Sequence, residues 1–76
     1  MNKPYTIIQC SNYFEYMNFK DNFTTVGPIM EYADSTYTIK THVSLNKYLI
    51  FNYAPTAIIT QVSFRNGRAT YTKLKD

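Results

Sequence analysis

The residues best suited to chemistry in this sequence are the cationic side chains at its C-terminal end. Residues 1–64 carry four lysines and four carboxylates, which cancel, whereas residues 65–76 carry a net charge of +3. A concentrated basic segment favours binding to phosphates, because neutralising them releases counterions. The alternative is that an exposed edge strand carries lysines to prevent aggregation. The expected partner-binding residues are Arg65, Asn66, Arg68, Tyr71, Lys73 and Lys75.

The other reactive side chains are too few and too scattered for catalysis. The sequence has one cysteine, Cys10, and one histidine, His42, and its internal carboxylates at positions 15, 21, 31 and 34 show no paired spacing. No stretch matches a metal-ligand pattern, a glycine-rich phosphate loop or a nucleophile elbow. We read His42 as a solvated strand residue, and Cys10 as a small buried hydrophobe rather than a partner of His42. We therefore expect no enzyme activity, catalytic residue, metal site or cofactor.

A β-hairpin is predicted to present the basic residues, because two alternating runs flank Asn66-Gly67. This dipeptide is the strongest short-range signal for a type I′ turn, and a two-residue turn pairs Arg65 with Arg68. Side chains alternate between the two faces of the hairpin. The face expected to point into the core carries Ile58, Thr60, Val62, Phe64, Ala69, Tyr71 and Lys73. The other, mostly polar face carries Ile59, Gln61, Ser63, Thr70, Thr72 and Leu74.

The N-terminal half predicts a strand followed by one helix. Residues 4–10 alternate as a strand, with Thr6, Ile8 and Cys10 on one side. Residues 12–20 form the expected helix, with Ser11 as its N-cap and Glu15 in the first turn. The alternative for this aromatic-rich segment is a strand or an irregular segment.

The middle of the sequence predicts further strands. Extended segments are expected at 24–26 and 29–32, separated by Gly27-Pro28 and followed by a turn at 33–35. The alternation at 36–45 predicts a half-buried antiparallel strand. The apolar run at 48–54 predicts a central strand covered on both faces.

These elements predict one small domain over residues 1–76, of the α+β class and rich in β-structure. Its strands, five to six in number, form an antiparallel meander with one short N-terminal helix. One short helix covers only one face of such a sheet. The sheet therefore either curls into a small barrel or packs its second face against another subunit, as a homodimer, or against a target protein.

Composition suggests where such a chain works. A single cysteine suits a reducing compartment, and neither a signal peptide nor a transmembrane run is visible, so we expect a cytoplasmic protein with no membrane contact. Asn, Lys, Ile, Tyr and Phe make up 33 of the 76 residues. All five have A/T-rich codons, which indicates an A/T-rich genome. A compact chain of this kind suits a phage or mobile-element accessory protein.

Two binding functions are compatible with this sequence. Tyrosine is enriched in interface hot spots, which predicts a phage-type protein that inhibits or modulates a host protein or nucleoprotein complex by direct binding. The alternative is a nucleic-acid-binding protein that uses the basic C-terminal hairpin, with Tyr71 or Phe64 available for stacking. Against the first prediction, the tyrosines could serve mainly in core packing. The tyrosines considered available for contact are Tyr5, Tyr13, Tyr16, Tyr32, Tyr37 and Tyr71.

Overall fold

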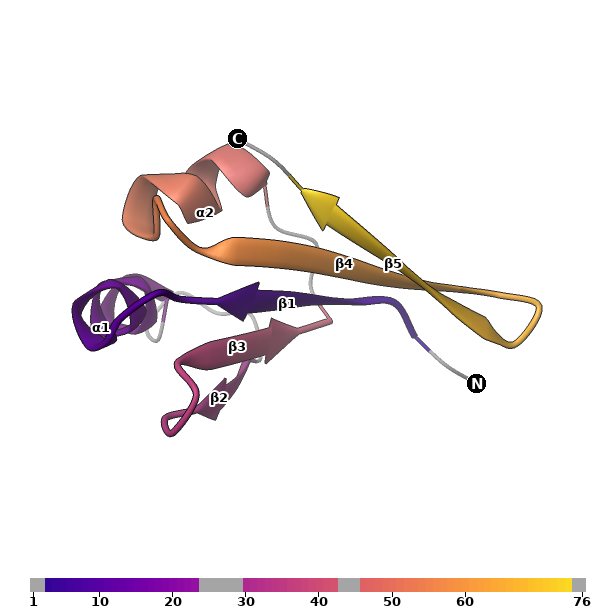
Figure 1. Cartoon of the computed structure of the whole chain (residues 1–76), viewed down its shortest axis with the longest axis horizontal. Coiled ribbons are helices and arrows are strands. Elements are labelled where there is room, and N and C mark those ends of the chain that lie inside the picture. The colour runs from indigo at the N-terminus through magenta and orange to yellow at the C-terminus, as the bar shows by residue number, and fades with distance from the viewer. Residues whose placement is uncertain (1–2, 24–29, 43–45, 75–76) are drawn as a thin grey trace.

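The structure, a computed structural model, describes residues 3–23, 30–42 and 46–74. Its described part contains five strands and two helices (Figure 1). In chain order they are β1 (Tyr5–Gln9), α1 (Tyr13–Phe23), β2 (Met30–Ala33), β3 (Thr38–Thr41), α2 (Lys47–Tyr53), β4 (Ile58–Arg65) and β5 (Arg68–Leu74).

All five strands belong to one antiparallel sheet in the order β2-β3-β1-β4-β5. The α+β class is confirmed, but the predicted meander is wrong because β1 lies in the middle of the sheet. The sheet is open rather than closed into a barrel, with β2 and β5 as the edges of its described part. The first six elements follow the β-α-β-β-α-β order of the split arrangement found in ferredoxin-like domains, and β5 extends it by a hairpin.

The predicted N-terminal helix is confirmed as α1, which extends three residues past its expected end. Its cap is shifted by one residue from the expected Ser11. The side chain of Asn12 accepts a hydrogen bond from the Glu15 backbone N–H at 2.9 Å, the bond that an N-cap residue makes to the third helical position. Tyr16 and Phe19 point into the core, whereas Phe14 is 83% exposed.

The second helix corrects the predicted central strand at residues 48–54. The side chain of Asn46 accepts a hydrogen bond from the Tyr48 backbone N–H at 2.8 Å and caps α2. Ile50 and Ala54 are fully buried, and their spacing of four places them on one face of a helix. The run therefore buries a single helical stripe, with Tyr48 and Leu49 exposed on the other side.

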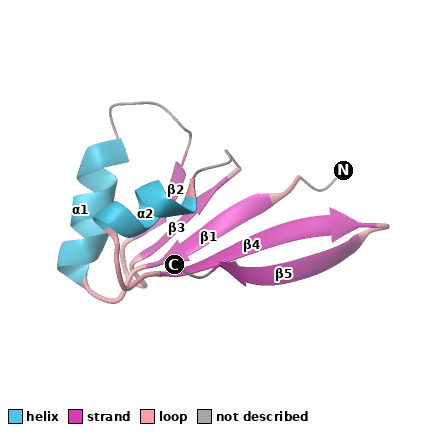
Figure 2. Ribbon diagram, turned by 90° about the horizontal axis from the view of Figure 1, so that it is seen from above, coloured by secondary structure: helices cyan, strands magenta, loops and turns pink. Residues whose placement is uncertain are grey.

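The core lies between the two helices and one face of the sheet. Both helices pack near the same end of the sheet, and the β4–β5 hairpin extends away from them (Figure 2). The register aligns one row of side chains across all five strands, namely Tyr32, Ile39, Ile8, Ile59 and Leu74. Ile8, Ile39 and Ile59 in this row are fully buried against the helices.

The hairpin register is confirmed, but the expected inward face is wrong. Arg65 pairs with Arg68 and Val62 with Tyr71, and Asn66 and Gly67 have φ values of 52° and 77°, the positive values that a type I′ turn needs. The helices cover the face with Ile59 and Leu74. On the opposite face Ile58 is 50% exposed and Tyr71 is 65% exposed, although Val62 is buried there.

The remaining strand predictions are confirmed in part. β1 has its expected sides, with Thr6, Ile8 and Cys10 buried. β2 covers most of the strand expected at 29–32, and a turn follows it. The alternation expected at 36–45 holds for β3, where Ile39 and Thr41 are buried. The predictions for residues 24–29 and 43–45 lie outside the described residues.

Candidate binding surfaces on the arm and the open face

The β4–β5 hairpin projects beyond the rest of the sheet. β1 pairs with β4 only as far as Val62, opposite Tyr5, so residues 63–70 form a two-stranded extension that we call the arm. The arm lengthens the molecule, whose extents are 38 × 24 × 24 Å (Figure 1). A short two-stranded ribbon of this kind holds its register through its turn and its backbone pairing rather than through a core.

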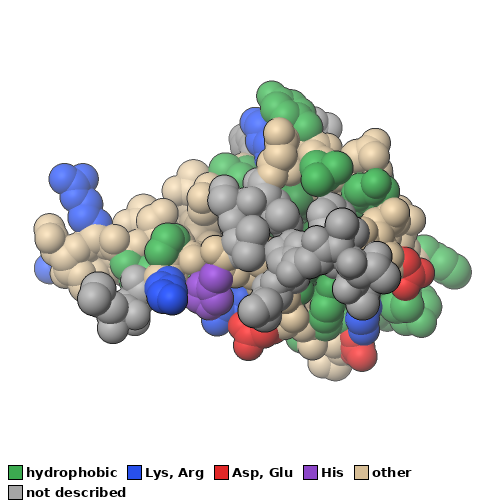
Figure 3. Space-filling view, turned by 180° about the vertical axis from the view of Figure 1, so that it is seen from behind, with side chains coloured by type: hydrophobic (Ala, Val, Ile, Leu, Met, Phe, Trp, Pro, Cys, Tyr) green, Lys and Arg blue, Asp and Glu red, His purple; other side chains and the backbone are tan. Residues whose placement is uncertain are grey.

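The end of the arm carries two arginines on opposite sides of the turn. Arg65, Asn66, Gly67 and Arg68, which we call the arginine tip, are all exposed. Arg65, Asn66 and Arg68 line an open depression together with Thr70. Neither guanidinium forms an ion pair with another described residue. Lys or Arg side chains stand out at the end of the arm in Figure 3.

The structure divides the predicted binding residues between two faces. Alternation puts Arg65 and Arg68 on the side that the helices cover further along the sheet, and it puts Tyr71 and Lys73 on the opposite side. Tyr71 and Lys73 are exposed. Lys75 lies outside the described residues. The predicted set is therefore exposed where it is described, but it does not form one continuous patch.

The side of the sheet opposite the helices is a second candidate surface, which we call the open face. None of the described helices covers it. The members used below are Tyr5, Ile7, Lys40, His42, Val62, Phe64, Tyr71 and Lys73.

The Tyr5 ring contacts two other rings of the open face. The ring centroid of Tyr5 lies 5.7 Å from that of His42 and 6.1 Å from that of Phe64. The Nζ atom of Lys40 lies 4.4 Å from the Tyr5 centroid and 3.8 Å from Oε2 of Glu31. His42 is exposed as expected, although its Nδ1 also lies 3.1 Å from the Pro4 carbonyl oxygen. The open face therefore combines aromatic rings with cations.

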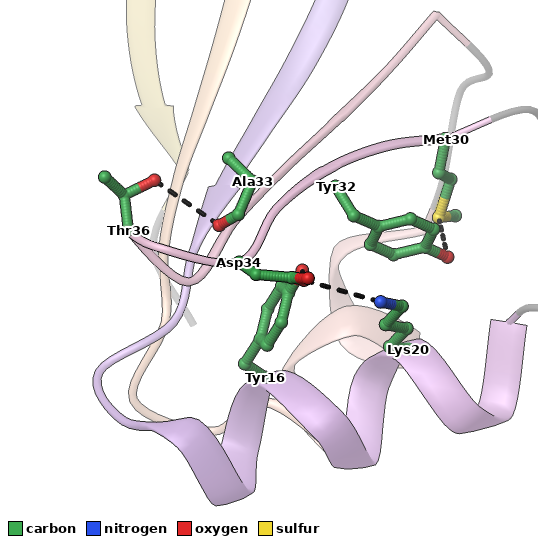
Figure 4. A network of polar contacts seen from close by, with 7 residues as sticks. All are labelled: Tyr16, Lys20, Met30, Tyr32, Ala33, Asp34 and Thr36. Atoms are coloured by element: carbon green, nitrogen blue, oxygen red, sulfur yellow. Dashed lines mark hydrogen bonds and ion pairs between the residues drawn. The ribbon is translucent and has the colours of Figure 1, made fainter.

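A polar network joins α1 to the β2–β3 turn (Figure 4). The hydroxyl of Tyr16 donates a short hydrogen bond to Asp34, and Nζ of Lys20 lies 3.4 Å from the same carboxylate. Burial and this hydrogen bond raise the pKa of Tyr16 well above its usual range. The Tyr16 hydroxyl and the Lys20 charge lower the pKa of Asp34. Tyr16 thus stays protonated and Asp34 ionised at neutral pH, which suits a structural tie rather than proton transfer.

A second polar cluster joins the β1–α1 and α2–β4 connections. Glu15, only 9% exposed, accepts hydrogen bonds from the Thr56 backbone N–H at 3.1 Å and from the Thr56 hydroxyl at 2.6 Å. The hydroxyl of Ser11 donates to the Thr56 carbonyl oxygen at 2.9 Å. This buried carboxylate is satisfied by its neighbours, so we assign it to folding.

The cysteine and the histidine of this sequence lie far apart in the structure. Cys10 follows β1 on the covered face, whereas His42 contacts Pro4 beside the other end of β1, on the open face. Five strand residues separate these ends by roughly 16 Å. Burial, and then the charge of Glu15, raises the pKa of Cys10 to about 11. No group of three or more His, Cys, Asp or Glu side chains that could hold a metal ion occurs in the described ranges.

Sequence reasoning considered Tyr5 available for contact but missed Lys40 and His42 as its neighbours on one surface, and it misplaced one tyrosine. Tyr16, considered available for contact, is 1% exposed and belongs to the core. Tyr5 and His42 become neighbours only because β1 pairs with β3, so long-range pairing decides their placement. The alternation within 36–45 did put Lys40 and His42 on one side of a strand, and this was the sequence signal that could have identified them as part of one surface.

The described part of the chain has no helix with the length and apolar character needed to cross a membrane. No family model, no curated protein and no solved structure matches this chain.

Proposed function

We propose that this chain is a non-enzymatic binding protein that inhibits or modulates a host protein or nucleoprotein complex by direct contact, with the arm as its contact element. The observation that carries this proposal is the arginine tip. Arg65 and Arg68 are exposed at the end of a projecting hairpin, without an ion-pair partner among the described residues. A guanidinium pairs bidentately with carboxylates and phosphates, so two unpaired ones favour an anionic partner.

Composition supports the source of the chain and the compartment in which it acts. The chain is a phage or mobile-element accessory protein that acts in the host cytoplasm. The predicted homodimer remains a prediction, and sedimentation at micromolar concentration checks it.

The experiment is an affinity purification from host lysate with the tagged full chain, before and after nuclease treatment. The test variant is Arg68→Ala, extended to Arg65→Ala with Arg68→Ala. Lys47→Ala is the matched control, because it removes one positive charge from α2, away from the arm. We expect the wild type and the control to recover one partner in stoichiometric amount, and the double variant to lose it more than about tenfold. If the double variant recovers the same partner equally well, the arm is not the contact element.

A second candidate function is direct nucleic-acid binding. Tyr71 is 65% exposed and lies on the same strand and the same face as Lys73. An exposed ring next to a cation favours nucleic-acid binding, because the ring can stack on a base while the cation contacts a phosphate. The expected result is oligonucleotide binding that weakens steeply with salt. Binding that is absent, or insensitive to salt, would exclude this candidate and leave the protein partner.

A further inference from the structure

The open face has rings where an uncovered sheet face is ordinarily polar. The register places Tyr5, Val62 and Tyr71 in one row across β1, β4 and β5. His42 extends this row on the β3 side through its contact with Tyr5. Tyr71 is the most exposed ring of the row, and no ring or ion contact within the described residues occupies it. A ring held in a strand with its face accessible can stack with a planar partner at little entropic cost.

Across β3 to β5, two lysines lie at the ends of the register row next to this row of rings. Lys40 and Lys73 belong to the register row that also contains Ile7 and Thr60. Residues two positions apart on a strand are separated by about 7 Å, which is therefore the backbone spacing between the two rows. The Lys40 side chain crosses this spacing, because its Nζ atom lies 4.4 Å from the Tyr5 ring centroid. Both rows cross the strands from β3 to β5, a span of about 14 Å at the usual strand spacing.

Charge on the described residues favours an anionic occupant for this face. Three of the four described carboxylates lie elsewhere, because Glu15 and Asp21 belong to α1 and Asp34 to the β2–β3 turn. Glu31 alone shares the face, and its exposed pair with Lys40 at 3.8 Å is weak. Three of the four described carboxylates therefore lie away from the side that carries the rings.

A row of rings with two lysines beside it matches the two components of a single nucleic-acid strand. Unpaired bases present flat faces for stacking, and the phosphates run beside them. In a duplex the base faces are hidden, so the ring row would have no counterpart there. A sheet about four strands wide accommodates two or three stacked bases.

Building on the nucleic-acid candidate above, we infer that the open face binds single-stranded nucleic acid. A base stacks on Tyr71, further bases lie along the row toward Tyr5 and His42, and Lys73 and Lys40 contact the phosphates. The arginine tip contributes charge beyond the end of this site. A host protein as the occupant of this face is the competing outcome.

The test uses fluorescence anisotropy with labelled twelve-nucleotide dT and U oligomers and the nuclease-treated full chain, over a salt series. Tyr71→Ala is the main variant, since this exposed side chain can be removed without opening the core. Phe14→Ala is the matched control, because it removes an even more exposed ring from α1. Thermal unfolding verifies that both variants fold. Tyr71→Phe separates stacking from loss of the hydroxyl.

We expect Tyr71→Ala to weaken binding by about 5- to 150-fold, the range for one stacked base, with Tyr71→Phe and Phe14→Ala close to wild type. Lys73→Ala should weaken all oligomers and reduce the salt slope by about 0.7. A matched duplex should bind more weakly than either single strand.

Two results overturn the inference and are distinguishable. If Tyr71→Ala binds like wild type while Arg65→Ala with Arg68→Ala abolishes binding, the nucleic-acid function stands and the open face is not its site. If no oligomer binds at low salt, the inference and the nucleic-acid candidate both fall, and the protein partner remains.

Discussion

Replacing Ile59 and its neighbour Ile58 tests which face of β4 belongs to the core. The two residues have the same side chain and are adjacent in one strand, but Ile59 is fully buried and Ile58 is 50% exposed. The hairpin pattern alone favours the opposite assignment. The pair therefore separates the observed architecture from the predicted one, with side-chain type and strand position held constant.

The expected costs follow from burial. Ile→Ala removes three carbon atoms, worth about 2.4 kcal/mol at about 0.8 kcal/mol per buried CH₂. At Ile59 a cavity adds to this, for a total of about 3–4 kcal/mol. At Ile58 half of the side chain is already in water and no cavity forms, so the cost is about 1 kcal/mol. A domain of this size has a total stability of about 4–11 kcal/mol, so Ile59→Ala consumes a large share of it.

The assay is urea unfolding followed by far-UV circular dichroism. A milder pair keeps both variants folded: Ile59→Val should cost about 1 kcal/mol and Ile58→Val less than about 0.5 kcal/mol. With a slope near 1 kcal/mol per molar, the urea midpoint of Ile59→Val should fall by about 1 M. A larger loss in the Ile58 variants than in the Ile59 variants would refute the assignment of the covered face.

Three further predictions address local features. The folded pKa of Asp34 lies below its ordinary 3.8, so its stabilising contribution is complete above that value and is lost as pH falls through the lower folded value. Acid titration of stability should therefore show a shallower loss below about pH 4 in Asp34→Asn than in the wild type, and equal slopes would contradict the tie to Tyr16. The pKa of Cys10, raised to about 11, predicts that iodoacetamide at pH 8 alkylates the folded chain more than about 100-fold more slowly than the urea-unfolded chain, and comparable rates would contradict its burial. Gly67→Ala should lower stability by about 1–2 kcal/mol through its positive φ alone, since a methyl group there meets nothing within 4 Å; an unchanged urea midpoint would contradict the turn conformation.

The parts of the fold that depend on neighbouring residues could be predicted from the sequence. Asn66-Gly67 dictates its turn, and a two-residue turn dictates the pairing of Arg65 with Arg68, so the hairpin register needs no distant information. The alternation of β1 and β3 likewise identifies their buried sides. The start of α1 was displaced by a single residue, because Ser11 and Asn12 are both good caps.

The parts that depend on distant residues could not be predicted in this way. Residues 48–54 are apolar at almost every position, so periodicity did not distinguish a strand from a helix. Asn46 before the run and Pro55 after it were the available helix boundary signals. The inward face of β4 depends on where the helices pack, and both of its faces carry aliphatic side chains. Which residues lie together on the open face depends on the central position of β1 in the sheet. Local sequence patterns do not indicate this position.

The central position of β1 also shapes how the chain acquires its structure. Tyr5 pairs with Val62, 57 positions later, and Thr6 with Thr41, 35 positions later. Such distant partners give a high contact order, which slows folding relative to a chain of successive hairpins. During synthesis β1 leaves the ribosome before β3 and β4, so both of its edges lack their partner strands until β3 and then β4 are made. A nascent chain interrupted between these two strands exposes one edge of β1, which makes it prone to chaperone capture or aggregation.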